Sequence, residues 1–268
     1  MFAPSVGMWL TVGLLRYQYT AGLAADQIEE LVARVWQITY CTRKRGRPPV
    51  LGLYRAVVLT LVYIRQNLNQ AAVGDLFGVS QPTVSRIYWK MLPLIGQALC
   101  LHVPDIEEAI RGRLVLVDGT DVPTGNRAGH DVNFSGKRRR AGLNIQIAAD
   151  TKGGLLGISV PLRGSIHDRK AFTECGWEAR LAETPVMADP AYQGTHAITP
   201  RKKPRGGELS VGDKANNRSI SSTRSAVERC IAHLKNWKML ANGYRGRLTE
   251  LPTVIRIITA LEFYQLGW

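Results

Sequence analysis

The sequence has few cysteines, and they lie far apart. Cys41, Cys100, Cys175 and Cys230 form no close pair in 268 residues. This spacing excludes a disulfide framework and a CxxC zinc site. Cys230 and His233 share one expected helix, but two ligands do not make a metal site. We therefore expect four ordinary thiols in a reducing, cytoplasmic compartment.

The sequence also lacks a long hydrophobic run. The apolar run from Val6 to Leu15 is shorter than the roughly 20 residues that span a bilayer, and the first positive charge, Arg16, follows it rather than precedes it. With 45% hydrophobic residues, the chain can still bury a core. We expect a soluble protein with no membrane partner.

Acidic residues are scarce relative to basic ones. The chain has 35 Lys and Arg against 21 Asp and Glu, which gives a net charge of +14 and a pI of about 10.0. Such a protein usually meets a polyanion, because each phosphate contact releases counterions. Charge alone leaves a ribosome-type or merely alkaline protein open. Together with the helix-turn-helix motif described below, the charge favours a DNA partner and hence association with the nucleoid.

The N-terminal part of the chain has a helical pattern with a basic joint. Apolar residues recur at helical spacing from Ala25 to Thr39, and Leu53 to Gln66 is a strongly apolar helix. Between them, Arg43 to Pro49 is basic and contains two prolines. This joint is either a solvated linker or an arm that follows DNA phosphates or a minor groove. The sequence leaves both interpretations open.

The segment LFGVSQPTVSRIY is typical of a helix-turn-helix motif. Asn69 to Phe77 is an expected helix, Gly78 permits a positive φ in the turn, and Ser80 can cap a second helix that carries Pro82 near its start. A helical hairpin with no role in DNA binding is the alternative. The side chains expected to face a DNA groove are Gln81, Thr83, Ser85 and Arg86, while Val84 and Ile87 pack inward.

Short apolar runs replace the helical period near Pro104. We predict an α+β protein: residues 1–104 are helical and include the helix-turn-helix motif at about 69–92, and residues 105–268 form a ribonuclease-H-like α/β domain. The expected elements are strands at Leu114–Val117, Leu143–Ala149, Leu155–Pro161 and Pro185–Ala188, and helices at Asp168–Leu181, Ser222–Met239 and Leu251–Leu266.

Two acidic residues directly follow apolar strands. Asp118 follows LVLV and Asp189 follows PVMA, positions at which a carboxylate is costly unless something uses it. If the two strands are neighbours, the carboxylates meet, and a cation such as Mg²⁺ would offset their repulsion. Glu228, at the margin of the packed face of its helix, is the candidate for a third ligand of a two-metal site.

Each of these acids has a structural alternative. Ser225 and Glu228 fit a capping box, so Glu228 could only cap a helix. Asp118 could belong to an Asp-Gly-Thr turn. Asp121, three residues further on, competes with Asp118 for the position of first ligand.

Four segments, in order, carry a resemblance to a known family. They are VDGTDVP at Val117–Pro123, GSIHD at Gly164–Asp168, ADPAYQG at Ala188–Gly194 and RSAVERCIAHLK at Arg224–Lys235. The first two acids are 71 positions apart, and the glutamate follows 39 positions later. The chain resembles DDE transposases of bacterial insertion sequences, of the IS-five type with Harbinger-like relatives. Ser221 stands where many relatives have a tyrosine.

The resemblance implies a DNA transposase. Asp118, Asp189 and Glu228 would hold two Mg²⁺ ions, with Mn²⁺ able to substitute, and would cut a phosphodiester and then join the free 3′-hydroxyl to target DNA. Arg224 and Lys235 would contact phosphate. The implied partners are double-stranded DNA at transposon ends and target sites and a second copy of the chain, with no small-molecule substrate.

Further residues have open roles. Arg229, Lys137 to Arg140 and Arg201 to Arg205 are candidates for phosphate contact. Asp168, which follows His167 in the family segment, is either a fourth ligand or a helix cap, and we favour the cap. The main alternative function is a catalytically silent, sequence-specific DNA-binding protein, such as a repressor or a domesticated transposase. A metal-dependent nuclease for RNA or damaged DNA is a second alternative.

Overall fold

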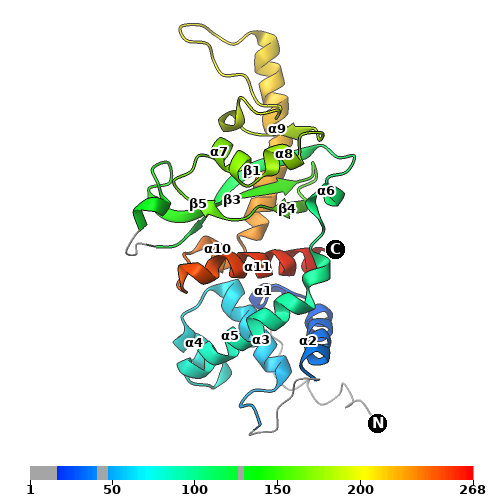
Figure 1. The fold of residues 1–268 in the computed structure, drawn as a ribbon, viewed down its shortest axis with the longest axis vertical. Helices are drawn as coiled ribbons and strands as arrows, with labels where there is room; N and C mark the ends of the chain where they lie inside the picture. Colours follow the sequence, from blue (N-terminus) through cyan, green and yellow to red (C-terminus); the bar gives the residue numbers. More distant parts are fainter. Residues whose placement is uncertain (1–16, 41–47, 126–129, 268) are drawn as a thin grey trace. The chain divides into compact units, whose positions relative to one another are not determined.

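The computed structural model describes residues 17–40, 48–125 and 130–267. Two segments of interest, the apolar run at 6–15 and most of the basic joint at 43–49, lie outside these residues. The chain divides into two compact units, Met1–Ala98 and Leu99–Trp268. Each unit is described by itself (Figure 1).

The first unit is helical. The two helices expected from the apolar period are confirmed, as α2 (Ala25–Tyr40) and α3 (Leu53–Gln66). They pack with α1 (Tyr17–Thr20), α4 (Gln70–Phe77) and α5 (Gln81–Ala98). Burial of apolar side chains is the main favourable term for such a bundle. Its core contains Leu23, Ile28, Leu31, Val35, Leu59, Leu61, Ile64, Val84, Leu92 and Ile95.

The α4–turn–α5 segment has the local chemistry that the sequence indicates. Asn69 caps α4 by accepting a hydrogen bond from the Ala72 backbone N–H at 2.7 Å. Gly78 ends the helix with φ 68°. A Cβ at Gly74 would lie 2.5 Å from the Val79 carbonyl oxygen, so the turn folds back closely over α4. The predicted helix-turn-helix geometry is confirmed.

The second unit contains a mixed sheet. Its strands are ordered β2–β3–β1–β6, and β4 and β5 pair with other parts of β3. The β1–β3 pair is antiparallel and the β1–β6 pair is parallel. The α+β class is confirmed, as is the hairpin of β3 and β4. The strands are β1 (Val115–Pro123), β2 (Phe134–Ser135), β3 (Arg140–Ala149), β4 (Leu155–Ile158), β5 (Leu162–Arg163) and β6 (Val186–Met187).

β1 is longer than the predicted strand 114–117. It continues through Asp118 and Thr120 to Pro123, paired with β3 over its whole second half. The interpretation of Asp118-Gly-Thr as a turn is therefore wrong. Long-range pairing with β3 overrides the turn propensity of the Asp-Gly sequence.

Helices cover the sheet, and one of them extends past it. The expected helix 168–181 is interrupted at Gly176, which has φ 81°. A core between helices and sheet includes Val115, Val117, Leu156, Phe172, Trp177, Val186 and Tyr192. The helices are α6 (Ile106–Ala109), α7 (Asp168–Glu174), α8 (Trp177–Arg180), α9 (Val211–Leu234), α10 (Lys238–Ala241) and α11 (Leu251–Leu266).

α9 begins 11 residues earlier than predicted. Ser210 caps it by accepting a hydrogen bond from the Asp213 backbone N–H at 3.0 Å. Its first half is polar and extends beyond the sheet in Figure 1, which explains why apolar periodicity did not predict it. Ser225 and Glu228 therefore lie in mid-helix, and the capping-box interpretation of Glu228 is wrong. No helix among the described residues has the length and apolarity that a membrane crossing requires.

Candidate functional site

Asp118 and Asp189 are brought together by the parallel pair β1–β6. The register pairs Val115 with Val186 and Leu116 with Met187, so its continuation sets Asp118 opposite Asp189. The Asp189 carboxylate also accepts a hydrogen bond from the Ala191 backbone N–H at 2.8 Å, which fixes its orientation. Asp118 lies inside β1 rather than at its end, but the predicted juxtaposition is present.

Asp118 is in an environment that disfavours its ionised form. Its pKa is raised from 3.8 to about 6, mainly by burial; the charges of Asp189 and Asp168 also raise it, while Arg224 and a backbone hydrogen bond from Gly119 lower it. The Arg224 Nη2 atom lies 3.7 Å from Asp118 Oδ2. Arg224 thus faces a carboxylate in the structure, and its contact with DNA phosphate stays a prediction.

Asp168 is another carboxylate near Asp118, and its charge raises the pKa of Asp118. It is the first residue of α7, whose cap position is His167 with no side-chain cap. Its Oδ1 atom accepts a hydrogen bond from Asn144 Nδ2 at 3.0 Å, and Lys137 Nζ lies 3.7 Å from its Oδ2 atom. The predicted role as a helix cap is therefore wrong, because the carboxylate is turned toward the sheet.

A buried polar chain supports Asp168. Asn144 also accepts a hydrogen bond from Gln146 Nε2 at 2.9 Å, and the Tyr192 hydroxyl donates to Gln146 Oε1. Tyr192 and Gln146 are fully buried. Buried polar groups that are fully paired favour one arrangement of their neighbours. Sequence reasoning missed these three residues, although Asn144 and Gln146 alternate with apolar residues in β3, which indicates one polar face.

Gly119 provides the space for Asp168. A Cβ atom at this position would lie 2.3 Å from Asp168 Oδ1 and 3.1 Å from Gln146 Nε2. Any other residue would displace the carboxylate or the strand. Steric crowding therefore explains why a glycine follows Asp118, and only the folded structure shows this crowding.

Glu228 lies on α9, one turn beyond Arg224, and is exposed to solvent. It makes no hydrogen bond or ion pair with any residue that the structure describes. Within the described residues, no three His, Cys, Asp or Glu side chains are gathered as a metal site would require. The structure thus brings Asp118 and Asp189 together but does not bring Glu228 to them.

Asp121 is surrounded by cations. Arg138 Nη1 lies 2.9 Å from Oδ1, Arg140 Nη2 lies 2.7 Å from Oδ2, and Lys235 Nζ lies 3.6 Å from Oδ1. Although burial raises its pKa, the Arg140 hydrogen bond and the three cations lower it below the ordinary value. This paired carboxylate is not a competitor for the place of Asp118. The predicted contact of Lys235 with DNA phosphate stays a prediction.

The four expected groove-facing residues lie at the start of α5. Gln81 and Arg86 are exposed, and Thr83 and Ser85 are half-buried. Arg86 Nη2 donates to Thr83 Oγ1 at 3.2 Å. Val84 is fully buried, as predicted.

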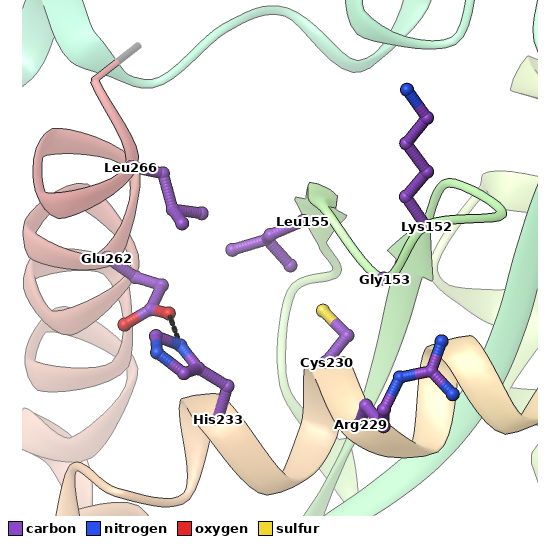
Figure 2. A pocket seen from close by; sticks show the side chains of 8 residues that line it. All are labelled: Lys152, Gly153, Leu155, Arg229, Cys230, His233, Glu262 and Leu266. Carbon is purple, nitrogen blue, oxygen red and sulfur yellow. Dashed lines mark hydrogen bonds and ion pairs between the residues drawn. The ribbon is translucent and has the colours of Figure 1, made fainter.

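A separate cavity of about 230 Å³ lies between α9, α11 and the β3–β4 turn (Figure 2). His233 Nδ1 lies 2.5 Å from Glu262 Oε1, and Trp237 Nε1 donates to Glu262 Oε2 at 2.7 Å. Cys230 is buried, and burial raises the pKa of its thiol to about 12. Cys230 is a free cysteine, and the buried Glu262 connects α11 to the end of α9.

Comparison with known proteins identifies the family. The family model described as DDE superfamily endonuclease matches residues 117–262. The chain belongs to the DDE superfamily endonucleases. The helix-turn-helix model of the same superfamily matches residues 50–101. The resemblance stated from the four sequence segments is confirmed.

Two relatives cover most of this DDE superfamily endonuclease. One is named a putative transposase for insertion sequence element IS112, from Streptomyces albus G, with 30% identity over 82% of this chain and 83% of the relative. The other is named a probable transposase for insertion sequence element IS702, from Microchaete diplosiphon, with 28% identity over 84% of this chain and 85% of the relative. No solved structure matches the chain.

The donor set of the endonuclease domain fits a hard divalent cation. Asp118 and Asp189 supply carboxylate oxygens, the ligands that Mg²⁺ prefers. Burial and two neighbouring negative charges raise the pKa of Asp118, so an added cation would stabilise its ionised form. The residues present are therefore compatible with the metal dependence of the family.

The raised pKa of Asp118 leads to a stability prediction. The protonated form is favoured in the folded state, so this contribution is complete below pH 3.8 and is lost as the pH rises through about 6. In EDTA at pH 8, we expect Asp118→Asn to be more stable than wild type by roughly 2 kcal/mol. Urea denaturation from pH 4 to 8 measures the free energy of unfolding of both proteins. Glu174→Gln, a change of an exposed acid, is the control. The prediction would be contradicted if the variant and wild type had the same free energy of unfolding at pH 8, or if their difference were the same at pH 4 and pH 8.

Proposed function

We propose that this chain is an insertion-sequence transposase that binds the ends of its element, cuts them in a Mg²⁺-dependent reaction and joins them to target DNA. The observation that supports this proposal is the proximity of Asp118 and Asp189: the β1–β6 register leads to both residues, and the charge of Asp189 raises the pKa of Asp118. The family also supports the proposal, because this chain matches both the DDE superfamily endonuclease and the helix-turn-helix unit of that superfamily. The names of both relatives support the same activity.

We propose Asp118, Asp189 and Glu228 as the residues that hold two Mg²⁺ ions, for which Mn²⁺ can substitute. Bound there, the metal supplies activation of the attacking oxygen and neutralisation of charge on the phosphate. Asp118 lies in β1, Asp189 follows β6 by two residues, and Glu228 comes from the exposed side of α9. The chain of Tyr192, Gln146 and Asn144 holds Asp168 next to this centre.

The proposed reaction has two stages at one centre. Hydrolysis breaks a phosphodiester and leaves a 3′-hydroxyl on the element and a 5′-phosphate on the flanking strand. The 3′-hydroxyl then attacks a target phosphodiester, so that a new P–O bond forms and the target strand's own 3′-oxygen leaves as a hydroxyl. The protein forms no covalent link to DNA at either stage. Arg224, half-buried beside Asp118, can turn to a phosphate once the charge of Asp118 is otherwise neutralised. We also propose that Lys235 contacts a phosphate.

We propose that the start of α5 recognises the DNA sequence. Gln81, Thr83, Ser85 and Arg86 lie in its first two turns, where the recognition helix of a helix-turn-helix motif meets base edges. Gln81 and Arg86 are exposed and can reach a groove directly. Because two ends must be joined, we also propose that two copies of the chain act together.

Cleavage of the cognate DNA tests the proposal. The purified chain is incubated with labelled duplex that carries the DNA flanking its own reading frame, with Mg²⁺, Mn²⁺ or EDTA. We expect a nick at one defined position with either metal and none in EDTA. Sequence-specific binding without cleavage would instead support a DNA-binding relative that has lost its chemistry. Cleavage of RNA in preference to duplex DNA would support a nuclease.

A further inference from the structure

The group of charges around Asp121 is not used by the proposed metal centre. We call Asp121, Arg138, Arg140 and Lys235 the Asp121 cluster. Its carboxylate is 6% exposed, yet three cationic groups lie within 2.7 to 3.6 Å of its oxygens. Arg140 binds one oxygen through both Nε and Nη2, and Arg138 and Lys235 approach the other.

The cluster joins three parts of the chain. Asp121 belongs to β1, Arg138 and Arg140 to the turn and start of β3, and Lys235 to the end of α9. An ionised carboxylate that is buried is stable only when it is paired. The same carboxylate keeps three cations close together, although they repel one another. Asp121 therefore determines where these cations lie.

The three cations carry more positive charge than Asp121 neutralises, and they are accessible to solvent. Three positive charges face one negative charge, and the side chains of Arg138, Arg140 and Lys235 are 33%, 47% and 25% exposed. A merely structural ion pair needs one cation per carboxylate. The excess favours an anionic ligand at the exposed side of the cluster.

The cluster lies beside the acidic centre. Arg138 Nη2 donates to the carbonyl oxygen of Gly119 at 3.2 Å, one residue beyond Asp118. On the same turn, Lys137 Nζ lies 3.7 Å from Asp168 Oδ2. The turn before β3 therefore extends the positive surface from Asp121 to the carboxylates. A DNA strand whose phosphodiester lies at the carboxylates would bring neighbouring phosphates to this surface.

We propose that Asp121 is a positioning residue, which holds Arg138, Arg140 and Lys235 as one surface for the phosphates of DNA next to the acidic centre. Guanidinium groups suit this role because they can bind a carboxylate on one edge and a phosphate on another. The inference rests on the proposed function in that the ligand is DNA. It does not require that the metal centre be active.

The test compares two opposite predictions for the DNA affinity of one variant. Asp121→Asn removes one negative charge, so simple electrostatics predicts tighter binding to DNA. Loss of positioning predicts the opposite, because three cations without a counter-ion separate. Binding of the full chain to a random-sequence duplex is measured in EDTA, where no cleavage occurs. We expect Asp121→Asn to bind about tenfold more weakly, with a salt dependence lower by about two phosphate contacts.

Matched controls come from an exposed ion pair of the same unit. Glu107→Gln also removes one negative charge, and Arg180→Gln removes its partner. We expect neither to weaken binding more than about twofold. Asp121→Glu keeps the charge and should restore binding to within about threefold of wild type. If Asp121→Asn binds as tightly as Glu107→Gln, the inference is wrong.

The remaining variants distinguish a failure of this inference from a failure of the proposed function. If Asp121→Asn does not fold, the double variant Arg138→Gln/Arg140→Gln tests the surface, and an unchanged salt dependence in that variant overturns the inference. If wild type itself binds no duplex DNA, the proposed function fails. If wild type binds and nicks DNA but the cluster variants bind normally, only the role of Asp121 fails.

Discussion

Asp118→Asn, Asp189→Asn and Glu228→Gln are each expected to lower metal-dependent cleavage about a thousandfold, a loss of about 4 kcal/mol of transition-state stabilisation. Each change replaces an anionic oxygen donor with an amide that binds Mg²⁺ weakly. Binding to the same duplex should persist, because the α5 residues are in a different unit. Single-turnover cleavage and binding in Ca²⁺ or EDTA measure the two properties separately.

Glu228→Gln is the most informative member of this series. Glu228 is exposed and has no hydrogen-bond or ion-pair partner among the described residues, so its replacement should not affect folding. A loss of cleavage would therefore report on chemistry alone. Glu174→Gln, an exposed helical acid paired with Lys170, is the matched control. If Glu228→Gln cleaves normally while Asp168→Asn does not, the third ligand is Asp168 and our assignment is wrong.

Gly119→Ala is expected to lower cleavage about a hundredfold without unfolding the protein. The added methyl group would lie 2.3 Å from Asp168 Oδ1, so the carboxylate must move from its place beside Asp118. A displacement of about 1 Å at a reacting centre has effects of this size. Single-turnover cleavage and circular dichroism measure activity and folding.

Gly52→Ala is the control for the glycine substitution, because a Cβ there meets no atom within 4 Å. A double-mutant cycle with Asp168→Asn tests the cause. If the alanine acts through Asp168, the double variant should be no slower than Asp168→Asn alone. Multiplicative losses would show that Gly119→Ala disturbs the site in another way, such as by bending β1.

Several features of the fold could be predicted because they depend on near neighbours in sequence. The apolar period predicts α2, α3 and α11, and Gly78 predicts the turn before α5. The apolar runs that precede Asp118 and Asp189 predict β1 and β6, and the two acids approach each other because the structure makes these strands neighbours. The bounds of β1 and α9 could not be predicted. β1 is extended by pairing with β3, and the first half of α9 is held by its Ser210 cap and polar contacts.

The partners of the charged side chains also required the structure. The sequence predicts that Arg224 and Lys235 are cations on one helix, but each contacts a carboxylate of β1, Asp118 and Asp121 respectively. Asp168 was predicted to cap α7, yet it bonds to Asn144 of β3. A charged group pairs with whichever opposite charge the packing of strands and helices brings near.

The sequence by itself therefore determined the α+β class and the helix-turn-helix motif, because short apolar and turn patterns specify both. Four segments in order carried the resemblance to the family, and the apolar runs before Asp118 and Asp189 indicated the two acids. Only the tertiary structure decided that Asp168 joins these acids through the space at Gly119, and that Asp121 gathers cations from two other segments. These arrangements depend on strand register and on the rotation of α9 against the sheet. Both are set by burial over the whole domain rather than by any local pattern.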